Sequence, residues 1–321
     1  MQRRLPALLT TALLALGIGA LGALGATGSH AAECATALPV TDSVRVIHGS
    51  GGTPNADNRG WVANSVLITA PRGVIVVDPG PTPEAGAALH CALQRAQLPA
   101  PIALIFTHPH PENILASNAF PGLPVFAAKA AATAMQERCE RCRAHLARAL
   151  GQDGLANVEA MMPDHPISAP TDTELGGLAL RLIPLGAAHS PGDLAVFIPA
   201  EGVLVGGDVA AIDELPDLRD GTLGAWIVAL DMLRALPATL VIPGRGKAVP
   251  PAQLARTHAY LDQLQRAADS AVHAWNTHHF LPAAQNASEF RRFDELHPLN
   301  SQHALREAEE RWWNELPKSA Q

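Results

Sequence analysis

The sequence predicts an α/β protein in which two β-sheets are flanked by helices, with a helical extension at the C-terminus. Three observations support this prediction. Short runs rich in Val, Ile and Leu end in turn residues, which is typical of strands. Between some of these runs lie stretches whose apolar residues recur at helical spacing. From Pro250 onward the pattern is almost purely helical. Because several predicted strands follow one another directly while others alternate with helices, a simple doubly wound order is not expected.

All of the predicted strands precede residue 250. In chain order they are DSVRVIHG, NSVLITA, GVIVVD, IALIFTH, VFAA, LALRLIPLG, LAVFIPA, GVLVGGD and TLVIPG. The predicted helices between them are PEAGAALHCALQRAQ, KAAATAMQERCERCRAHLARAL and LGAWIVALDMLRAL. We therefore expect a sheet-containing domain over residues 32–250 and a helical extension over residues 251–321 that packs on it.

Residues 1–31 carry the pattern of a signal peptide. A basic start, MQRR, is followed by an apolar stretch from Leu5 to about Ala26 and then by GSHAAE, whose small residues Ser29 and Ala31 have the spacing that a signal peptidase prefers. The apolar stretch is long enough for an uncleaved anchor, but its Gly, Ala and Thr content and the small residues after it favour cleavage. We expect a periplasmic or secreted protein with no membrane span in the mature chain.

The charge balance excludes one class of partner. The chain has 23 Lys and Arg against 30 Asp and Glu, a formal net charge of −7. No basic surface is expected, so nucleic acid is not a predicted partner. A small-molecule substrate is the expected ligand.

Export also bears on the four cysteines, because disulfides persist outside the cytosol. Cys139 and Cys142 lie in the helical pattern MQERCERCRAHL, and the prediction for this pair is a local disulfide that ties a surface turn. Cys34 and Cys91 could then form a second bridge, although spacing alone does not determine the pairing. A metal-thiolate or redox role for Cys139 and Cys142 is the alternative, but no second Cys-x-x-Cys completes a structural zinc site.

Polar side chains follow four of the predicted strands, at positions where a rigid scaffold commonly presents functional groups. In chain order they are His108, His110 and Glu112 after IALIF, His189 and Asp193 in AAHSPGD, Asp208 after GVLVGG, and Arg245 after TLVIPG. Three protein ligands of this kind can hold a catalytic zinc ion and leave a position for water, whose pKa the zinc lowers. His108 and His110 can converge on one ion with His189 as the third ligand and Asp208 as a fourth ligand or a bridge. Taken alone, His-x-His also fits two solvated loop histidines.

The order of these motifs along the chain resembles that of the metallo-β-lactamase fold superfamily. The resemblance covers nearly the whole mature chain and rests on NRGWVANSVLITAPRGVIVVDPGP, THPHPENILASNAF, GAAHSPGDLAVFIP, GVLVGGD and VIPGRGKAV. More narrowly, HPHPEN and the tail FRRFDELHPLNSQHALREAEERW resemble the periplasmic zinc metallohydrolases associated with quinoproteins and sulfur oxidation. The resemblance implies an αββα sandwich with metals at one sheet edge, and a possible quinoprotein dehydrogenase pathway as partner.

The resemblance also implies roles for individual residues. His108, His110 and His189 would be the ligands of a first zinc ion, and Asp208 would bridge to a second metal. A water molecule activated by the metal would then attack the substrate.

The chain departs from the family pattern only on the second-metal side. Glu112 stands where the family has Asp, Asn113 where it has His, and Arg245 where it has the last His ligand. We therefore predict one zinc ion per chain. The permanently charged guanidinium of Arg245 would take the place of the second cation and pair with Glu112 or Asp208. One of these two carboxylates would accept a proton from water.

The leading prediction is thus an exported zinc-dependent hydrolase whose substrate the sequence does not identify. The alternative is a catalytically degenerate protein that binds a small molecule or a partner in the same cleft. Single residues also have structural interpretations: Arg245 as a surface arginine, Asn113 as a loop cap and Glu112 as a helix N-terminal carboxylate. In HSPGD, Asp193 would orient His189 as a hydrogen-bond acceptor.

Overall fold

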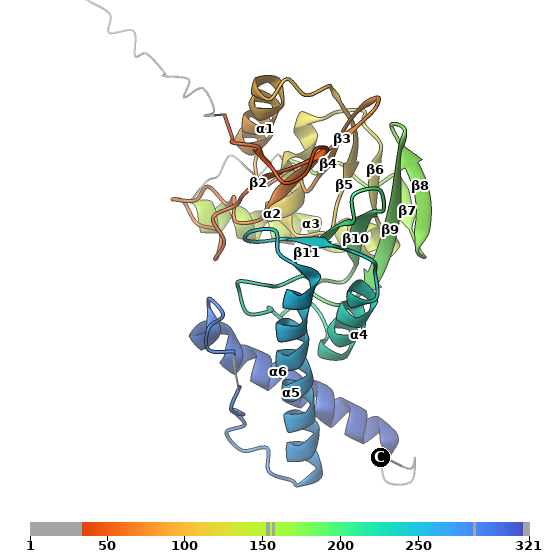
Figure 1. The fold of residues 1–321 in the computed structure, drawn as a ribbon. Coiled ribbons are helices and arrows are strands. Elements are labelled where there is room, and N and C mark those ends of the chain that lie inside the picture. The colour runs from red at the N-terminus through yellow and green to blue at the C-terminus, as the bar shows by residue number, and fades with distance from the viewer. Residues whose placement is uncertain (1–33, 152–154, 156–157, 285–286, 317–321) are drawn as a thin grey trace, which may run out of the picture. The chain divides into compact units, whose positions relative to one another are not determined.

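The computed structural model describes residues 34–151, 155, 158–284 and 287–316. The signal peptide predicted for residues 1–31 lies outside these residues. Ala32–Gln321 forms one compact unit, whose elements are shown in Figure 1. Within the described part of the chain, no helix combines the length and the apolar character needed to cross a bilayer.

The first sheet has seven strands in the order β1-β2-β3-β4-β5-β6-β7. Their bounds are β1 Leu38–Pro39, β2 Val44–Ile47, β3 Ser65–Ala70, β4 Gly73–Val77, β5 Pro101–Ile105, β6 Val125–Ala128 and β7 His165–Ile167. The strands from β1 to β4 pair antiparallel and those from β4 to β7 pair parallel. Because β4 and β5 run parallel, the residues that follow them, Asp78 and the loop of His108 and His110, meet at one edge of the sheet.

The second sheet has five strands in the order β12-β11-β10-β9-β8. Their bounds are β8 Thr171–Leu175, β9 Leu178–Gly186, β10 Asp193–Ile198, β11 Val203–Gly207 and β12 Leu240–Pro243. The pairs from β8 to β11 are antiparallel, whereas β11 and β12 run parallel. Asp208, directly after β11, and Arg245, shortly after β12, are therefore delivered to the same edge.

The two sheets pack face to face around the main hydrophobic core. In β10, Leu194, Val196 and Ile198 face this core, whereas Ala195 and Phe197 face a second core on the other side of the sheet. Both faces of β10 are thus buried, which explains why this strand is a continuous apolar run instead of an alternating one.

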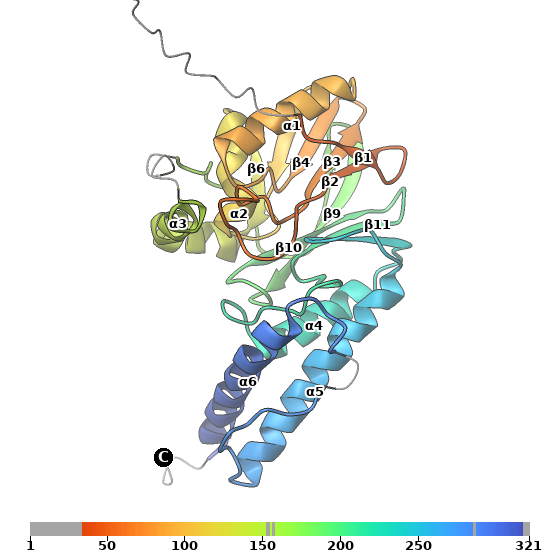
Figure 2. The same cartoon turned by 90° about the vertical axis from the view of Figure 1, so that its left-hand side faces the viewer.

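Helices cover the outer faces of both sheets, so the fold is an αββα sandwich, as predicted. On the first-sheet side lie α1 (Pro83–Arg95), the short α2 (Pro111–Ile114), the 3-10 segment η1 (Leu115–Ala119) and α3 (Lys129–Leu150). On the second-sheet side lie α4 (Leu223–Arg234), the 3-10 segment η3 (Pro251–Gln253), α5 (Leu254–His273) and α6 (Phe293–Glu315). Figure 2 shows α5 and α6 beneath α4, and all three contribute to the second core.

Each of the nine predicted strands is present, as β2 to β6 and β9 to β12. The structure adds β1, β7 and β8, which the sequence pattern does not predict. β8 has the polar sequence TDTEL and no buried residue, so its strand conformation comes from pairing with β9. The domain boundary at residue 250 stays a prediction.

The cysteines differ in part from expectation. Cys34 and Cys91 form a disulfide, which is the second bridge that the sequence allows. The predicted local disulfide between Cys139 and Cys142 is wrong, because both are free thiols on α3. Cys139 packs against the main core, whereas Cys142 lines a cavity, so the two sulfur atoms have different surroundings.

Loss of the Cys34–Cys91 disulfide is expected to lower the free energy of unfolding by about 2–4 kcal/mol, because the bridge restricts the unfolded chain over a sequence separation of 57 residues. Urea unfolding of Cys91→Ser against the wild-type protein measures the change. Cys142→Ser, which removes a free thiol, is the matched control and should unfold at nearly the wild-type urea concentration. Equal midpoints for all three proteins would contradict a stabilising role of the bridge.

Candidate metal centre

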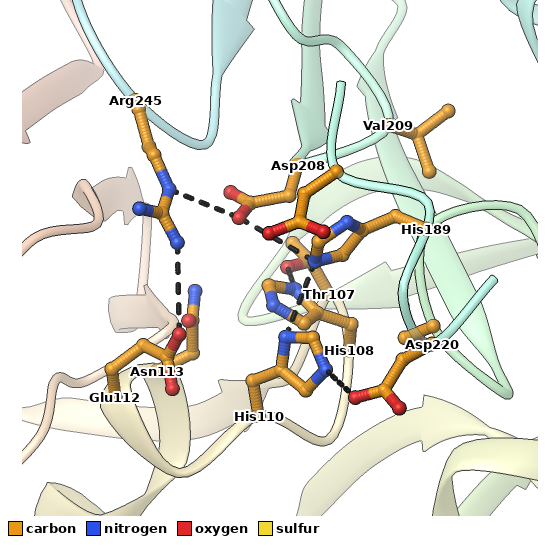
Figure 3. A network of polar contacts seen from close by, with 12 residues as sticks. Thr107, His108, His110, Glu112, Asn113, His189, Asp208, Val209, Asp220 and Arg245 are labelled. Carbon is orange, nitrogen blue, oxygen red and sulfur yellow. Dashed lines mark hydrogen bonds and ion pairs between the residues drawn. The ribbon is translucent and has the colours of Figure 1, made fainter. Parts of the chain in front are cut away.

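Three histidines from two loops form the centre of the site. His108 and His110 lie between β5 and α2, and His189 lies between β9 and β10. Potential ligand atoms of the three side chains all lie within 4.8 Å of one another, and Figure 3 shows the rings gathered together. The ring centroids are 4.8 to 4.9 Å apart in every pair, with the rings edge to face. The structure thus brings together the histidines that the sequence predicts as ligands.

The nitrogen positions fit a shared metal ion. His110 Nδ1 and His189 Nε2 lie 3.2 Å apart, close to the separation of about 3.3 Å that two imidazole nitrogens have on one tetrahedral zinc ion. His108 Nδ1 is 2.9 Å from Thr107 Oγ1, which leaves Nε2 of the same ring buried and without a hydrogen-bond partner. An unpaired buried nitrogen is costly in a folded protein, and a metal ion at this point would pair it.

Carboxylates hold the loop of His108 and His110 in place. The backbone N–H of Thr107 donates to Asp78 Oδ1 at 2.8 Å, and Thr107 Oγ1 donates to Asp78 Oδ2 at 2.6 Å. On the outer side, His110 Nε2 lies 3.1 Å from Asp220 Oδ2. The contact with Asp220 orients the His110 imidazole from behind, as is common for metal-binding histidines, whereas Asp78 holds the backbone of the loop through Thr107.

His189 is oriented through its backbone. Asp193 Oδ2 accepts the backbone N–H groups of His189 and Ser190 at 2.7 and 3.0 Å, and Asp193 Oδ1 accepts Ser190 Oγ at 2.7 Å. Asp193 therefore acts on His189 as the sequence predicts, although it contacts the main chain and not the ring. The ring itself meets the edge of Trp226, with centroids 5.4 Å apart.

Burial and neighbouring charges give the three rings different protonation states. Burial lowers the pKa of His108 well below its usual value and lowers the pKa of His189 to about 4. Burial also acts to lower the pKa of His110, but the hydrogen bond to Asp220 and the charge of Glu112 outweigh it and raise that pKa to about 9. At neutral pH, His108 and His189 are therefore neutral and able to bind metal, whereas His110 must first lose a proton.

Arg245 lies on the opposite side of the site, among three carboxylates. Its Nε is 3.1 Å from Asp208 Oδ2, its Nη2 is 3.6 Å from Glu112 Oε1 and its Nη1 is 3.7 Å from Glu214 Oε2. Nη1 also donates to the carbonyl oxygen of Gly52 at 2.5 Å. Figure 3 shows the guanidinium between Glu112 and Asp208. Only 15% of the side chain is exposed, so the interpretation of Arg245 as a surface arginine is wrong.

Asp208 faces both halves of the site. Its Oδ2 is 3.6 Å from His189 Nε2 as well as close to Arg245, and its Oδ1 is buried without a hydrogen-bond partner. Burial acts to raise the pKa of Asp208, but the positive charge of Arg245 outweighs it and holds that pKa well below its usual range. Gly244 leaves room for this carboxylate, because a Cβ atom there would lie 1.9 Å from Asp208 Oδ1. A role of Asp208 as metal ligand or bridge stays a prediction.

The side chain of Asn113 contacts Asp78, next to the histidines. Its side chain is buried, and its Nδ2 donates to Asp78 Oδ2 at 3.2 Å. Its Oδ1 is buried without a hydrogen-bond partner among the described residues. Its neighbour Glu112 lies in the first turn of α2, as the structural interpretation predicts, and also pairs with Arg245.

Two carboxylates of the site carry no signal in the sequence. Glu214 and Asp220 lie in the connection between β11 and α4, away from any strand end or motif. Glu214 is buried, accepts the backbone N–H of Gly52 at 2.6 Å and lies 3.8 Å from Arg292 Nη1. Arg292 precedes α6 with a left-handed φ of 60°. Glu214 thus joins Arg245 to the C-terminal helices, a contact that only tertiary packing creates.

Glu214→Gln is expected to lower the free energy of unfolding by roughly 2 kcal/mol, because Arg245 loses a buried charged partner. Denaturant unfolding measures the change. Glu295→Gln is the matched control, since Glu295 pairs with Arg292 at 2.7 Å but is half exposed, and its effect should stay within about 0.5 kcal/mol. Equal changes in the free energy of unfolding for the two substitutions would contradict the stabilising role assigned to Glu214.

Zinc affinity is expected to rise about tenfold per pH unit between pH 6 and pH 8, because zinc must displace the proton that His110 holds up to about pH 9. Above that pH the affinity should level off. Asp220→Asn removes the negative charge that helps to raise the pKa of His110. In this variant the zinc affinity should therefore level off at a lower pH. Competition with a chromogenic chelator across the pH range measures both curves. Identical curves would contradict the effect assigned to Asp220.

Comparison with known sequences identifies the family. A family model described as the metallo-beta-lactamase superfamily matches residues 58–245, a range that contains His108, His110, His189, Asp208 and Arg245. The metallo-beta-lactamase type 2 of Bacteroides fragilis is 28% identical over 90 residues, which cover 26% of this chain and 36% of that protein. The chain thus matches little more than a third of the length of this curated relative.

Solved structures show the same fold. The metallo-beta-lactamase from Pontibacter korlensis superposes with a TM-score of 0.56 at 20% identity, over 71% of this chain and 99% of that chain. The stereoselective inverting sec-alkylsulfatase from Pseudomonas sp. superposes with a TM-score of 0.68 at 16% identity, over 85% of this chain and 50% of that chain. At these identities the likeness concerns the fold alone. The family match over more than half of the sequence, on an αββα sandwich with three converging histidines, shows that the chain belongs to the metallo-β-lactamase superfamily.

Proposed function

We propose that the protein is an exported hydrolase that uses one zinc ion, held by His108, His110 and His189, to activate water. The observation that carries this proposal is the convergence of the three imidazoles, with His110 Nδ1 and His189 Nε2 3.2 Å apart. Export rests on the signal-peptide pattern of residues 1–31, and a periplasmic or secreted location is part of the proposal.

The contacts of Arg245 support a single metal ion. Its guanidinium already pairs with Glu112 and Asp208, the carboxylates that a second ion would need. A permanent positive charge at this place also repels a second cation. Asn113 offers only a neutral amide oxygen, Oδ1, which is buried without a hydrogen-bond partner in the described structure and is a weaker zinc ligand than the imidazole nitrogen of a histidine.

Zinc at the three histidines would lower the pKa of water and supply a nucleophile near neutral pH. The residues of the chain then divide the remaining work. Arg245 holds Asp208 ionised, so Asp208 is a weak base. Its role is to place a negative charge beside the histidines. Glu112 is the better candidate to accept a proton from water. Arg245 provides a fixed positive charge toward which the oxygen of a reacting carbonyl can develop negative charge.

The bond that is cleaved belongs to an ester, amide, thioester or related group. The superfamily hosts many chemistries, so the fold does not select among them. The names of the similar proteins suggest two further test substrates, a β-lactam and a secondary alkyl sulfate. The link to a quinoprotein dehydrogenase pathway stays a prediction based on HPHPEN and the tail of the chain.

Purified protein is expected to hold about one zinc ion per chain, and His110→Ala is expected to lose the ion and at least about a hundredfold of the hydrolysis rate. Elemental analysis and assays on ester, thioester, β-lactam and alkyl sulfate substrates measure both. His165→Ala, which alters a half-exposed histidine on β7 that is not part of the three-histidine group, is the control.

Two tightly bound zinc ions per chain would contradict the single-metal site. Hydrolysis that survives both chelation and His110→Ala would contradict zinc catalysis. Zinc binding without hydrolysis of any substrate class would instead favour the alternative, a binding protein that retains the fold.

A further inference from the structure

A cavity of about 610 Å³ opens beside the three histidines. His110, His189, Asp208 and Arg245 are among the residues that line it. One wall comes from α3, and another comes from the connection between β11 and α4. A substrate bound at the histidines would therefore extend along side chains that play no part in holding the metal.

The α3 wall presents one face of the helix. The residues of α3 that line the cavity are Arg138, Arg141, Cys142, His145, Leu146 and Ala149. Their spacing of three and four residues places them on one side of an α-helix. Arg138 and Arg141 therefore project from neighbouring turns toward the same space.

The carboxylates that line the cavity have ion-pair partners, whereas two of its arginines have none in the part of the chain that the structure describes. Every carboxylate that lines it lies within ion-pair distance of a cationic partner, and none of these partners is on α3. The pairs are Glu112, Asp208 and Glu214 with Arg245, Asp217 with Arg219, and Asp220 with His110. In contrast, Arg138 and Arg141 make no ion pair or side-chain hydrogen bond to any residue that the structure describes. Two guanidinium groups at the cavity thus keep all of their donors available for a ligand.

The connection between β11 and α4 adds apolar side chains to the cavity beside its paired carboxylates. These are Ala210, Ala211, Ile212, Leu215 and Pro216. Side chains of this kind bind a hydrocarbon segment, while guanidinium groups bind oxyanions such as carboxylate or sulfate through paired N–H donors. The cavity therefore combines a group of apolar side chains with the two arginines of α3, beside the histidines.

We propose that Arg138 and Arg141 form a subsite for an anionic group of the substrate, so that the enzyme acts on amphiphilic organic anions whose charged group is remote from the bond cleaved. This assignment rests on the proposed function and specifies its substrate class. The hydrocarbon part of the substrate lies along the apolar side chains between β11 and α4, the scissile group lies at the histidines, and the oxyanion lies against α3.

A matched pair of esters tests the subsite in the zinc-loaded enzyme. The mono-para-nitrophenyl ester of adipic acid carries a free carboxylate, and para-nitrophenyl hexanoate has the same chain length without the charge. We expect Arg138→Gln and Arg141→Gln each to raise KM for the adipate ester about three- to fivefold, in keeping with partly exposed charge pairs. The double variant should raise it about tenfold or more, with kcat nearly unchanged. KM for the hexanoate ester should not change.

Two further variants control for general effects. Arg148→Gln removes an exposed arginine of the same helix that does not line the cavity, and it should leave both esters unaffected. Arg141→Lys keeps the charge and should recover part of the affinity for the adipate ester. Equal changes of KM for both esters in the double variant, or no change for either, would overturn the proposal.

A binding assay examines the subsite without catalysis. Cys142 lines the cavity next to Arg141, so the rate of its alkylation by iodoacetamide reports on a bound ligand. The reaction is followed at mildly alkaline pH, because burial raises the pKa of the thiol. A Cys139→Ser background removes the other free thiol. Hexanoate and hexyl sulfate are expected to slow the reaction several-fold, whereas hexanol is not. Protection by only one of the two anions distinguishes a carboxylate from a sulfate subsite. The same two anions should protect Cys142 equally in chelator-treated protein. That result would exclude protection by an anion bound to the metal.

The two assays separate this proposal from the proposed function. If neither ester is hydrolysed, or if hydrolysis survives His110→Ala, the zinc-hydrolase function fails and the protection of Cys142 alone decides the subsite. Protection that is lost in Arg138→Gln/Arg141→Gln supports it. Protection that is absent in the parent protein, or unchanged in the double variant, overturns it.

Discussion

The burial of the Arg245 guanidinium is the constraint on which the rest of the site depends. A permanent charge can leave water only where other charges and carbonyl oxygens replace its hydration. Arg245 obtains these partners from segments that are far apart in the sequence: Glu112, the pair Asp208 and Glu214 in the connection after β11, and the carbonyl oxygen of Gly52. The three carboxylates are themselves largely buried, so each of them also requires the arginine. The loops after β5, β11 and β12 are consequently held in one mutual arrangement.

The same charge divides the site into two halves that are supported separately. On the histidine side, Asp78, Asp193 and Asp220 hold the loops and rings of the ligands. None of these three carboxylates pairs with Arg245. A metal ion at the histidines would therefore not draw these three carboxylates away from the guanidinium. Asp208 faces both halves, since its Oδ2 lies close to both Arg245 and His189.

The C-terminal helices take part in this arrangement through Glu214. The backbone around it is bonded to the segment before α6 on both sides, since Arg291 N donates to Asp213 O at 2.8 Å and Leu215 N donates to Arg291 O at 3.0 Å. Arg292, in a left-handed conformation that is unfavourable for a residue with a Cβ, points its side chain to Glu214 and Glu295. The extension thus contributes Arg292 to the cavity lining and packs into the second core.

The sequence by itself determined two sheets flanked by helices, nine of the strands and the three histidines, because burial patterns and strand-end motifs are local properties of the chain. The αββα arrangement and the prediction that Arg245 substitutes for a second cation came from the resemblance to the superfamily and from the residues that replace its expected ligands. Only the tertiary structure decided that Glu214 and Asp220 belong to the site, that Cys139 and Cys142 are free, and that Arg138 and Arg141 share a cavity with the histidines. The physical reason is that ion pairing and cavity lining depend on contacts between segments distant in sequence, and a single charged residue in a loop or on a helix face carries no local sign of the partner it will meet.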